Sequence, residues 1–189
     1  MIDLSRAKVN KTVPKNRFKA ELSDVQSIRW LYKISPDTAD FRHGDEITEI
    51  QIFEISFKSG TANKKELAAI QKAIPYSVLF LAYSKFYYTI EGELFESETQ
   101  FLQGDNLAIE RRSSKLTDLH EDLATKFIPI PQRASEGIPR LVERYRRLTA
   151  LDKEIAALQR RVDNEKQPNI RFELNDKLKA LKAERQGLI

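Results

Sequence analysis

Cysteine is absent from the 189-residue chain, and histidine is limited to His43 and His120. The lack of cysteine excludes disulfide bonds, thiolate zinc sites and a cysteine nucleophile. The two histidines are far apart in the sequence, and no metal-ligand spacing that we recognise surrounds either one. His43 lies in a glycine-containing turn, where we expect an exposed loop residue, and His120 is expected on a helix surface. The sequence therefore predicts no metal site and no cofactor.

Glycine is also scarce, with six residues, and none stands in a phosphate-binding loop of the Gly-x-x-x-x-Gly-Lys-Ser/Thr or Gly-x-Gly-x-x-Gly kind. The Gly-x-Ser-x-Gly pattern of serine hydrolases is missing as well. These absences disfavour a nucleotide-binding fold and a serine hydrolase. They favour a protein without catalytic activity, although an enzymatic role stays open.

Long hydrophobic runs are missing too. The longest unbroken apolar run covers residues 78–83, whereas a helix that crosses a membrane needs about 20 apolar residues. The first residues, Met1 to Arg6, do not resemble a secretion signal, because no apolar run follows a basic start. We therefore expect a cytoplasmic protein.

What the chain does contain is charge, at 32% of residues, together with 41% hydrophobic residues. Residues 139–189 hold 13 basic and 8 acidic residues, against 19 basic and 20 acidic in residues 1–138. Such an excess is typical of a surface that meets nucleic acid or an acidic partner, and also of long solvated helices. The hydrophobic content predicts a globular body with an appendage.

Hydrophobic periodicity predicts an α+β body over residues 1–128. A helix is expected behind Asn63 and another over residues 116–127, both packed on the sheet, while a basic arm precedes a short helix opened by Pro14. The expected elements form a mixed sheet of five strands, at residues 28–34, 47–58, 76–83, 85–91 and 93–101.

Beyond a Pro-containing linker at residues 129–139, residues 140–189 predict an antiparallel helical hairpin, or coiled coil. Apolar residues recur there at spacings of three and four, with a break at Gln167-Pro168-Asn169. Two helices cannot fully cover both stripes, so the remaining apolar edge should meet the body, a second copy or another protein. The predicted partner-binding residues are Leu148, Leu151, Ile155, Leu158, Leu174, Leu178 and Leu181.

A divergent metal-dependent nuclease is a further alternative, because Asp37 and Glu54 loosely resemble the acidic residues of restriction nucleases. That core needs an acidic residue and a lysine two positions apart on one strand, whereas Glu54 and Lys58 are four apart. Direct nucleic-acid binding is the other alternative, through the hairpin and the basic arm that carries Lys11 and Lys15.

Several segments resemble an uncharacterised bacterial family catalogued as domain of unknown function 4391. The segments that carry the resemblance are 9–15 with Phe18, 30–38, 49–55, 72–76, 165–169 and Leu174-Asn175. Position 168 departs from the family pattern, since Pro stands where a bulky apolar residue is usual.

The resemblance implies a protein encoded beside helicase-like and DNA-methyltransferase proteins, in neighbourhoods of restriction or phage defence, with no activity attached. Among the matching residues are polar ones that a sheet core would not demand and that could line one nucleic-acid or ligand site: Lys11, Lys15, Lys33, Glu49, Gln51 and Lys72. The leading hypothesis is an accessory or adaptor subunit that binds a helicase or methyltransferase through the hairpin.

Overall fold

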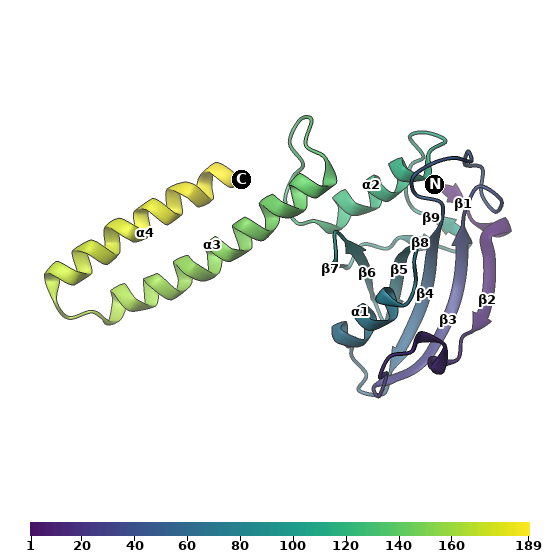
Figure 1. Cartoon of the computed structure of the whole chain (residues 1–189), viewed down its shortest axis with the longest axis horizontal. Helices are drawn as coiled ribbons and strands as arrows, with labels where there is room; N and C mark the ends of the chain where they lie inside the picture. Colours follow the sequence, from purple (N-terminus) through teal and green to yellow (C-terminus); the bar gives the residue numbers. More distant parts are fainter. The chain divides into compact units, whose positions relative to one another are not determined.

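The computed structural model describes residues 1–189, and the chain divides into two compact units, Met1–Phe127 and Ile128–Ile189. We call the first unit the body and the second the hairpin unit. The body combines a six-stranded sheet with helices, and the hairpin unit holds two long helices that pack on each other (Figure 1). The predicted α+β class with a C-terminal helix pair is confirmed.

The body sheet has the strand order β2-β3-β4-β5-β6-β7. Its strands are β2 (Lys8–Thr12), β3 (Val25–Ile34), β4 (Ile50–Phe57), β5 (Ser77–Ala82), β6 (Lys85–Ile90) and β7 (Glu93–Ser97). Strands β4 and β5 are parallel because helix α1 (Lys64–Lys72) carries the chain back across the sheet, and every other neighbouring pair is antiparallel. The sheet is therefore mixed, as predicted.

The sixth strand was not expected. Residues 8–12, predicted as part of a basic arm, form strand β2 on the open edge of β3. Their composition gave no strand signal, because hydrogen bonds to β3 and not an apolar face hold them in place. Exposed lysines such as Lys11 also discourage a further strand from pairing at this edge. Three two-residue strands, too short for any pattern to reveal, form a second sheet: β1 (Ile2–Asp3), β9 (Asn106–Leu107) and β8 (Leu102–Gln103).

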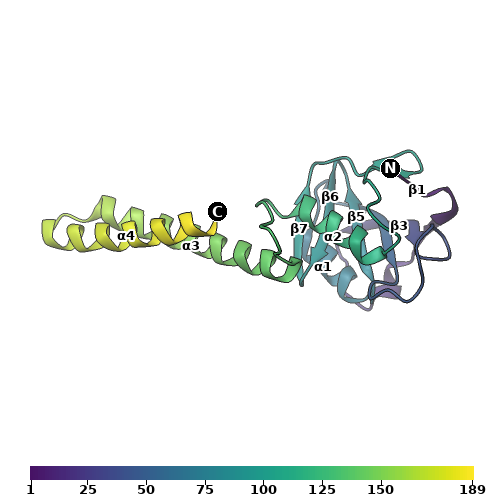
Figure 2. The same cartoon turned by 90° about the horizontal axis from the view of Figure 1, so that it is seen from above.

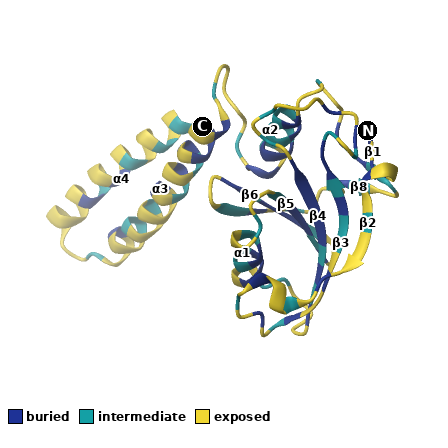
Figure 3. Cartoon of the chain, turned by 45° about the vertical axis from the view of Figure 1, so that its right-hand side comes forward, coloured by how far each residue is buried: buried dark blue, intermediate teal, exposed yellow.

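Side-chain alternation along β6 separates the two cores of the body. Tyr87 belongs to the core on the α1 side, with Leu67 and Ile70 of that helix. Tyr88 points to the other face, where its ring lies 5.6 Å from that of Phe127 in helix α2 (Leu116–Phe127). Because neighbouring residues of a strand face opposite ways, α1 and α2 cover opposite faces of the sheet. Strand β4 is consequently buried on both faces, as its dark colour in Figure 3 shows.

The start of α1 is held by two side chains. Asn63 caps the helix as predicted, since its side chain accepts hydrogen bonds from the backbone N–H groups of Lys65 and Glu66. Glu66 was not singled out from the sequence. Its buried carboxylate accepts hydrogen bonds from the backbone N–H groups of Asp24 (2.9 Å) and Val25 (2.8 Å). Glu66 therefore joins α1 to the beginning of β3. A one-turn helix, η2 (Lys15–Phe18), follows Pro14 as expected, with Phe18 buried; a second, η1 (Ser5–Ala7), precedes β2.

In the hairpin unit, helix α3 (Ile138–Asn164) and helix α4 (Pro168–Leu188) lie side by side and antiparallel in both views (Figures 1 and 2). Val162, Leu174 and Leu178 form the buried centre of the contact, and ion pairs such as Arg147–Glu184 cross between the helices. None of the chain's helices combines the length and hydropathy that crossing a membrane would require.

Arg144 in α3 ties three parts of the hairpin unit together. Its guanidinium donates hydrogen bonds to Glu136 Oε1 (2.8 Å), to the carbonyl oxygen of Pro131 (2.6 Å) and to that of Leu188 (2.8 Å). The side chains of Arg144 and Glu136 are only 6% and 10% exposed. Within the segment predicted as a linker, residues 131–136 are therefore held to the hairpin by a nearly buried ion pair.

This ion pair predicts that the hairpin unit loses stability in acid. The hydrogen bonds from Arg144 lower the pKa of Glu136 from 4.5 to about 2. Because the folded state favours the carboxylate, the stabilisation is complete above pH 4.5 and is lost as pH falls from there toward 2. We expect a loss of about 2–3 kcal/mol across that window. Thermal unfolding of the wild type and of Glu136→Gln would check this, since the variant should lack this part of the pH dependence; parallel profiles would contradict it.

Candidate functional site

Three of the six predicted polar site residues come together on the body sheet. Lys33 on β3 lies opposite Gln51 on β4, and Glu49 directly precedes that strand. Lys33 Nζ lies 3.1 Å from Glu49 Oε2, while the Gln51 amide donates a hydrogen bond to Glu49 Oε1. Glu49 and Gln51 are only 8% and 7% exposed. The Glu49 carboxylate is thus compensated by one cation and one amide, as a nearly buried charge requires.

The other three residues lie elsewhere. Lys15 Nζ donates a hydrogen bond to the carbonyl oxygen of Val25 (2.6 Å), so this lysine links η2 to β3. Lys11 is exposed on the edge strand β2, and Lys72 is exposed at the end of α1. The chain therefore does not gather the six residues into one site, and nucleic-acid binding by Lys11 and Lys15 stays a prediction.

Tyr76 marks the surface next to the Lys33–Glu49–Gln51 group. Three shallow pockets of about 290, 290 and 260 Å³ all include Tyr76 in their walls, and Glu49 or Gln51 lines each one. Trp30 shares the segment 30–38 with Lys33, Pro75 lies beside Tyr76 in the segment 72–76, and Val13 from the segment 9–15 also lines this surface. Four segments that are distant in sequence thus converge here, which makes this surface a candidate binding site.

The segment Ser35-Pro36-Asp37-Thr38 has a structural explanation. Thr38 Oγ1 accepts a hydrogen bond from the backbone N–H of Ser35 (3.0 Å) and donates one to the carbonyl oxygen of Lys33. These bonds close the turn that ends β3, so the motif shapes one wall of the pocket that also contains His43. His43 is exposed, as expected, with Nε2 3.7 Å from the Asp37 carboxylate.

His120 corrects an expectation. It was predicted on a helix surface, but it is half-buried between α2 and the sheet, with Nδ1 2.5 Å from Tyr88 Oη and 3.3 Å from Ser77 Oγ. Burial lowers the pKa of His120 and raises that of Tyr88. The tyrosine hydroxyl therefore stays protonated at neutral pH, and the tautomer of His120 determines which of the two side chains donates the hydrogen bond. The helical spacing around His120 could not reveal this, because Tyr88 reaches it from β6.

The residues considered for a nuclease are engaged separately. Glu54 accepts a hydrogen bond from Arg29 Nη1 (2.8 Å), and Lys58 Nζ donates one to the carbonyl oxygen of Ser23 (2.7 Å). Nowhere in residues 1–189 do three or more His, Cys, Asp or Glu side chains group as metal ligands would. The nuclease alternative gains no support from this arrangement.

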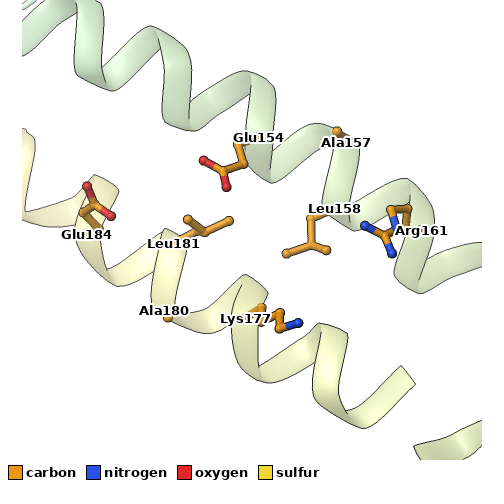
Figure 4. A pocket seen from close by; sticks show the side chains of 8 residues that line it. All are labelled: Glu154, Ala157, Leu158, Arg161, Lys177, Ala180, Leu181 and Glu184. Carbon is orange, nitrogen blue, oxygen red and sulfur yellow. The ribbon is translucent and has the colours of Figure 1, made fainter. Parts of the chain in front are cut away.

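The hairpin unit carries a groove along the contact between α3 and α4. It has a volume of about 470 Å³ and is open to one side, and Figure 4 shows Leu158 and Leu181 pointing into it from the two helices. Eight residues line it: Glu154, Ala157, Leu158, Arg161, Lys177, Ala180, Leu181 and Glu184.

Burial divides the predicted partner-binding residues into two groups. Leu148, Leu151, Leu174 and Leu178 are buried, so a partner cannot contact them in this arrangement. Ile155, Leu158 and Leu181 are only half-buried. The apolar edge left uncovered is therefore narrower than the leucine stripes implied, and it follows the groove.

Two large apolar side chains near the start of α4 were missed by the sequence reasoning. Phe172 is 66% exposed and Ile170 is 39% exposed. Ile170 follows the spacing of the apolar stripe on α4 but is left partly exposed, whereas Phe172 falls outside that stripe. The sequence did hold a signal for Phe172: a phenylalanine outside the apolar stripe of an amphipathic helix is unusual, because a solvated position favours polar residues.

Comparison with known proteins gives one match. A family model described as Domain of unknown function (DUF4391) matches residues 5–94 and 86–184. No curated protein and no solved structure matches the chain. The two matched ranges run through the body sheet, the Tyr76 surface and both helices of the hairpin unit. Because they cover nearly the whole sequence, the chain belongs to the DUF4391 family.

Proposed function

We propose that this protein is a non-enzymatic accessory subunit of a bacterial DNA-processing assembly of the restriction or phage-defence type. In this proposal the hairpin unit binds a helicase-like or DNA-methyltransferase partner. The observation that carries it is the exposure of Phe172, a large aromatic side chain that the chain leaves in water. The choice of partner rests on the gene neighbourhoods that the family resemblance implies.

Phe172 loses the stabilisation that burial would give as long as no partner covers it. A phenylalanine contributes about 1.5–3 kcal/mol when it is fully buried, and aromatic side chains are common energetic centres of protein interfaces. Ile170 lies two residues away and is also partly exposed. The charged residues around them, Arg171 and Glu173, would form the polar rim of such an interface. Phe172 and Ile170 together are therefore a suitable anchor for a protein partner.

The test is co-expression of the full chain with the helicase-like and methyltransferase proteins encoded beside it, followed by affinity purification. We expect one of them to bind, and Phe172→Ser to weaken that binding at least tenfold, since about 1.4 kcal/mol of lost burial suffices. Ile189→Ser is the matched control, because Ile189 is also a large exposed apolar residue of the hairpin unit. If neither protein co-purifies, or if the two variants lose binding equally, this proposal is wrong.

A further inference from the structure

The groove of the hairpin unit has the same charge pattern on both of its walls. On α3 the order along the chain is Glu154, then Ala157 and Leu158, then Arg161; on α4 it is Lys177, then Ala180 and Leu181, then Glu184. Because the helices are antiparallel, both acidic residues lie at one end of the groove and both basic residues at the other (Figure 4). The groove is therefore acidic at one end, apolar in the middle and basic at the other end.

The spacing along each wall is regular. The two charges on each helix are seven residues apart, which corresponds to about 10 Å along the axis and places both on the same helix face. Leu158 and Leu181 occupy the middle, beside the small side chains of Ala157 and Ala180. Alternating small and large residues allow another pair of helices to approach closely and fill the groove.

We propose that this groove binds a second copy of the same chain, packed groove to groove about a two-fold axis through the leucine centre. A two-fold axis that runs across the groove places the same surface of both copies face to face. The residues of one copy then follow the reverse order of those in the other. The acidic end of one copy then lies against the basic end of the other, and Leu158 and Leu181 of both copies form a shared apolar centre. The product is an antiparallel four-helix bundle.

The charges favour a second copy over an unrelated helix. Glu154, Arg161 and Lys177 are exposed and make no ion pair within the chain, while Glu184 is held by Arg147. An unrelated helix would need its own segregated charges in the opposite order, whereas a second copy supplies that order by symmetry. Reversing either copy would bring like charges together, which is unfavourable. The same groove therefore determines both the partner and its direction.

The area of this surface determines the affinity that we expect for the dimer. Two helices about 10 Å wide and about 30 Å long present roughly 600 Å², somewhat below the roughly 800 Å² per partner of a standard stable interface. We therefore expect a dimer that dissociates in the micromolar range. Phe172 lies off this surface, because it precedes Lys177 by five residues and is turned about 140° around α4. The inference thus goes beyond the proposed function and does not depend on it.

The experiment is sedimentation velocity on the full chain across the micromolar range. We expect the wild type to form dimers, and Arg161→Glu and Glu154→Lys each to weaken dimerisation at least tenfold by placing like charges together. An equimolar mixture of the two variants should restore association, since one groove is then acidic and the other basic. Far-UV circular dichroism checks that both variants, changed at exposed positions, remain helical.

A wild type that stays monomeric, an unchanged dissociation constant for Arg161→Glu, or a mixture that does not associate would each overturn the inference. Phe172→Ser is the matched control and should dimerise like the wild type. The two experiments separate the two proposals. A wild type that dimerises but binds neither the helicase-like nor the methyltransferase protein contradicts only the proposed function, and a wild type that binds one of them but stays monomeric contradicts only the inference about the second copy.

Discussion

Replacing Arg144 by alanine is expected to destabilise the hairpin unit by about 3–5 kcal/mol, the range found when one partner of a buried ion pair is removed. The substitution leaves the nearly buried Glu136 carboxylate without its cation. It also removes the donors that the carbonyl oxygens of Pro131 and Leu188 accept from, and the loss of these hydrogen bonds adds to the effect. The segment before α3 and the end of α4 should both lose their attachment to α3.

Thermal unfolding followed by circular dichroism, together with amide hydrogen exchange of residues 131–136, would measure this loss. Arg160→Ala is the control, because Arg160 is an exposed arginine of the same helix, and it should change stability by less than about 0.5 kcal/mol. The double variant Arg144→Ala with Glu136→Ala should recover part of the stability, since no uncompensated charge is then left. Equal losses in Arg144→Ala and Arg160→Ala would show that the ion pair does not hold the segment.

Replacing Glu66 by alanine should destabilise the body by about 3 kcal/mol. The carboxylate accepts hydrogen bonds from two backbone N–H groups, those of Asp24 and Val25, at the entry to β3. Hydrogen bonds to a charged group contribute about 1.5–3 kcal/mol each, and buried N–H groups left without an acceptor are costly. Glu66 itself is buried, so water cannot readily replace it.

Urea unfolding followed by the fluorescence of Trp30 suits this test, because Trp30 is the only tryptophan and lies in β3 of the body. Glu66→Gln keeps one acceptor oxygen and should lose about half as much stability as Glu66→Ala. Lys65→Ala, at the exposed neighbouring position, should leave the urea midpoint nearly unchanged. An unaltered midpoint for Glu66→Ala would contradict the assigned role.

The candidate site on the body could be predicted only in part. The family resemblance pointed to Lys33, Glu49 and Gln51, and the β3–β4 register explains why these three meet. The same reasoning grouped Lys11 and Lys72 with them, although β2 and the end of α1 place those lysines apart. Tyr76 was among the matching residues, but its central place on the surface depends on the parallel pairing of β4 with β5, which brings the segment before β5 next to Glu49.

Side-chain periodicity was enough to determine the elements with a continuous apolar face: five of the six strands of the large sheet, helices α1 and α2, and the 27 residues of α3. This periodicity shows which face of a helix or strand is apolar, and the apolar face is set by residues that are close together in the sequence. Tertiary structure alone decided what covers each side: strand β2 on the edge of β3, Tyr88 against His120, Glu66 beneath β3 and Arg144 between Glu136 and the end of α4. Those contacts are polar and join residues of different elements, so no local apolar pattern records them.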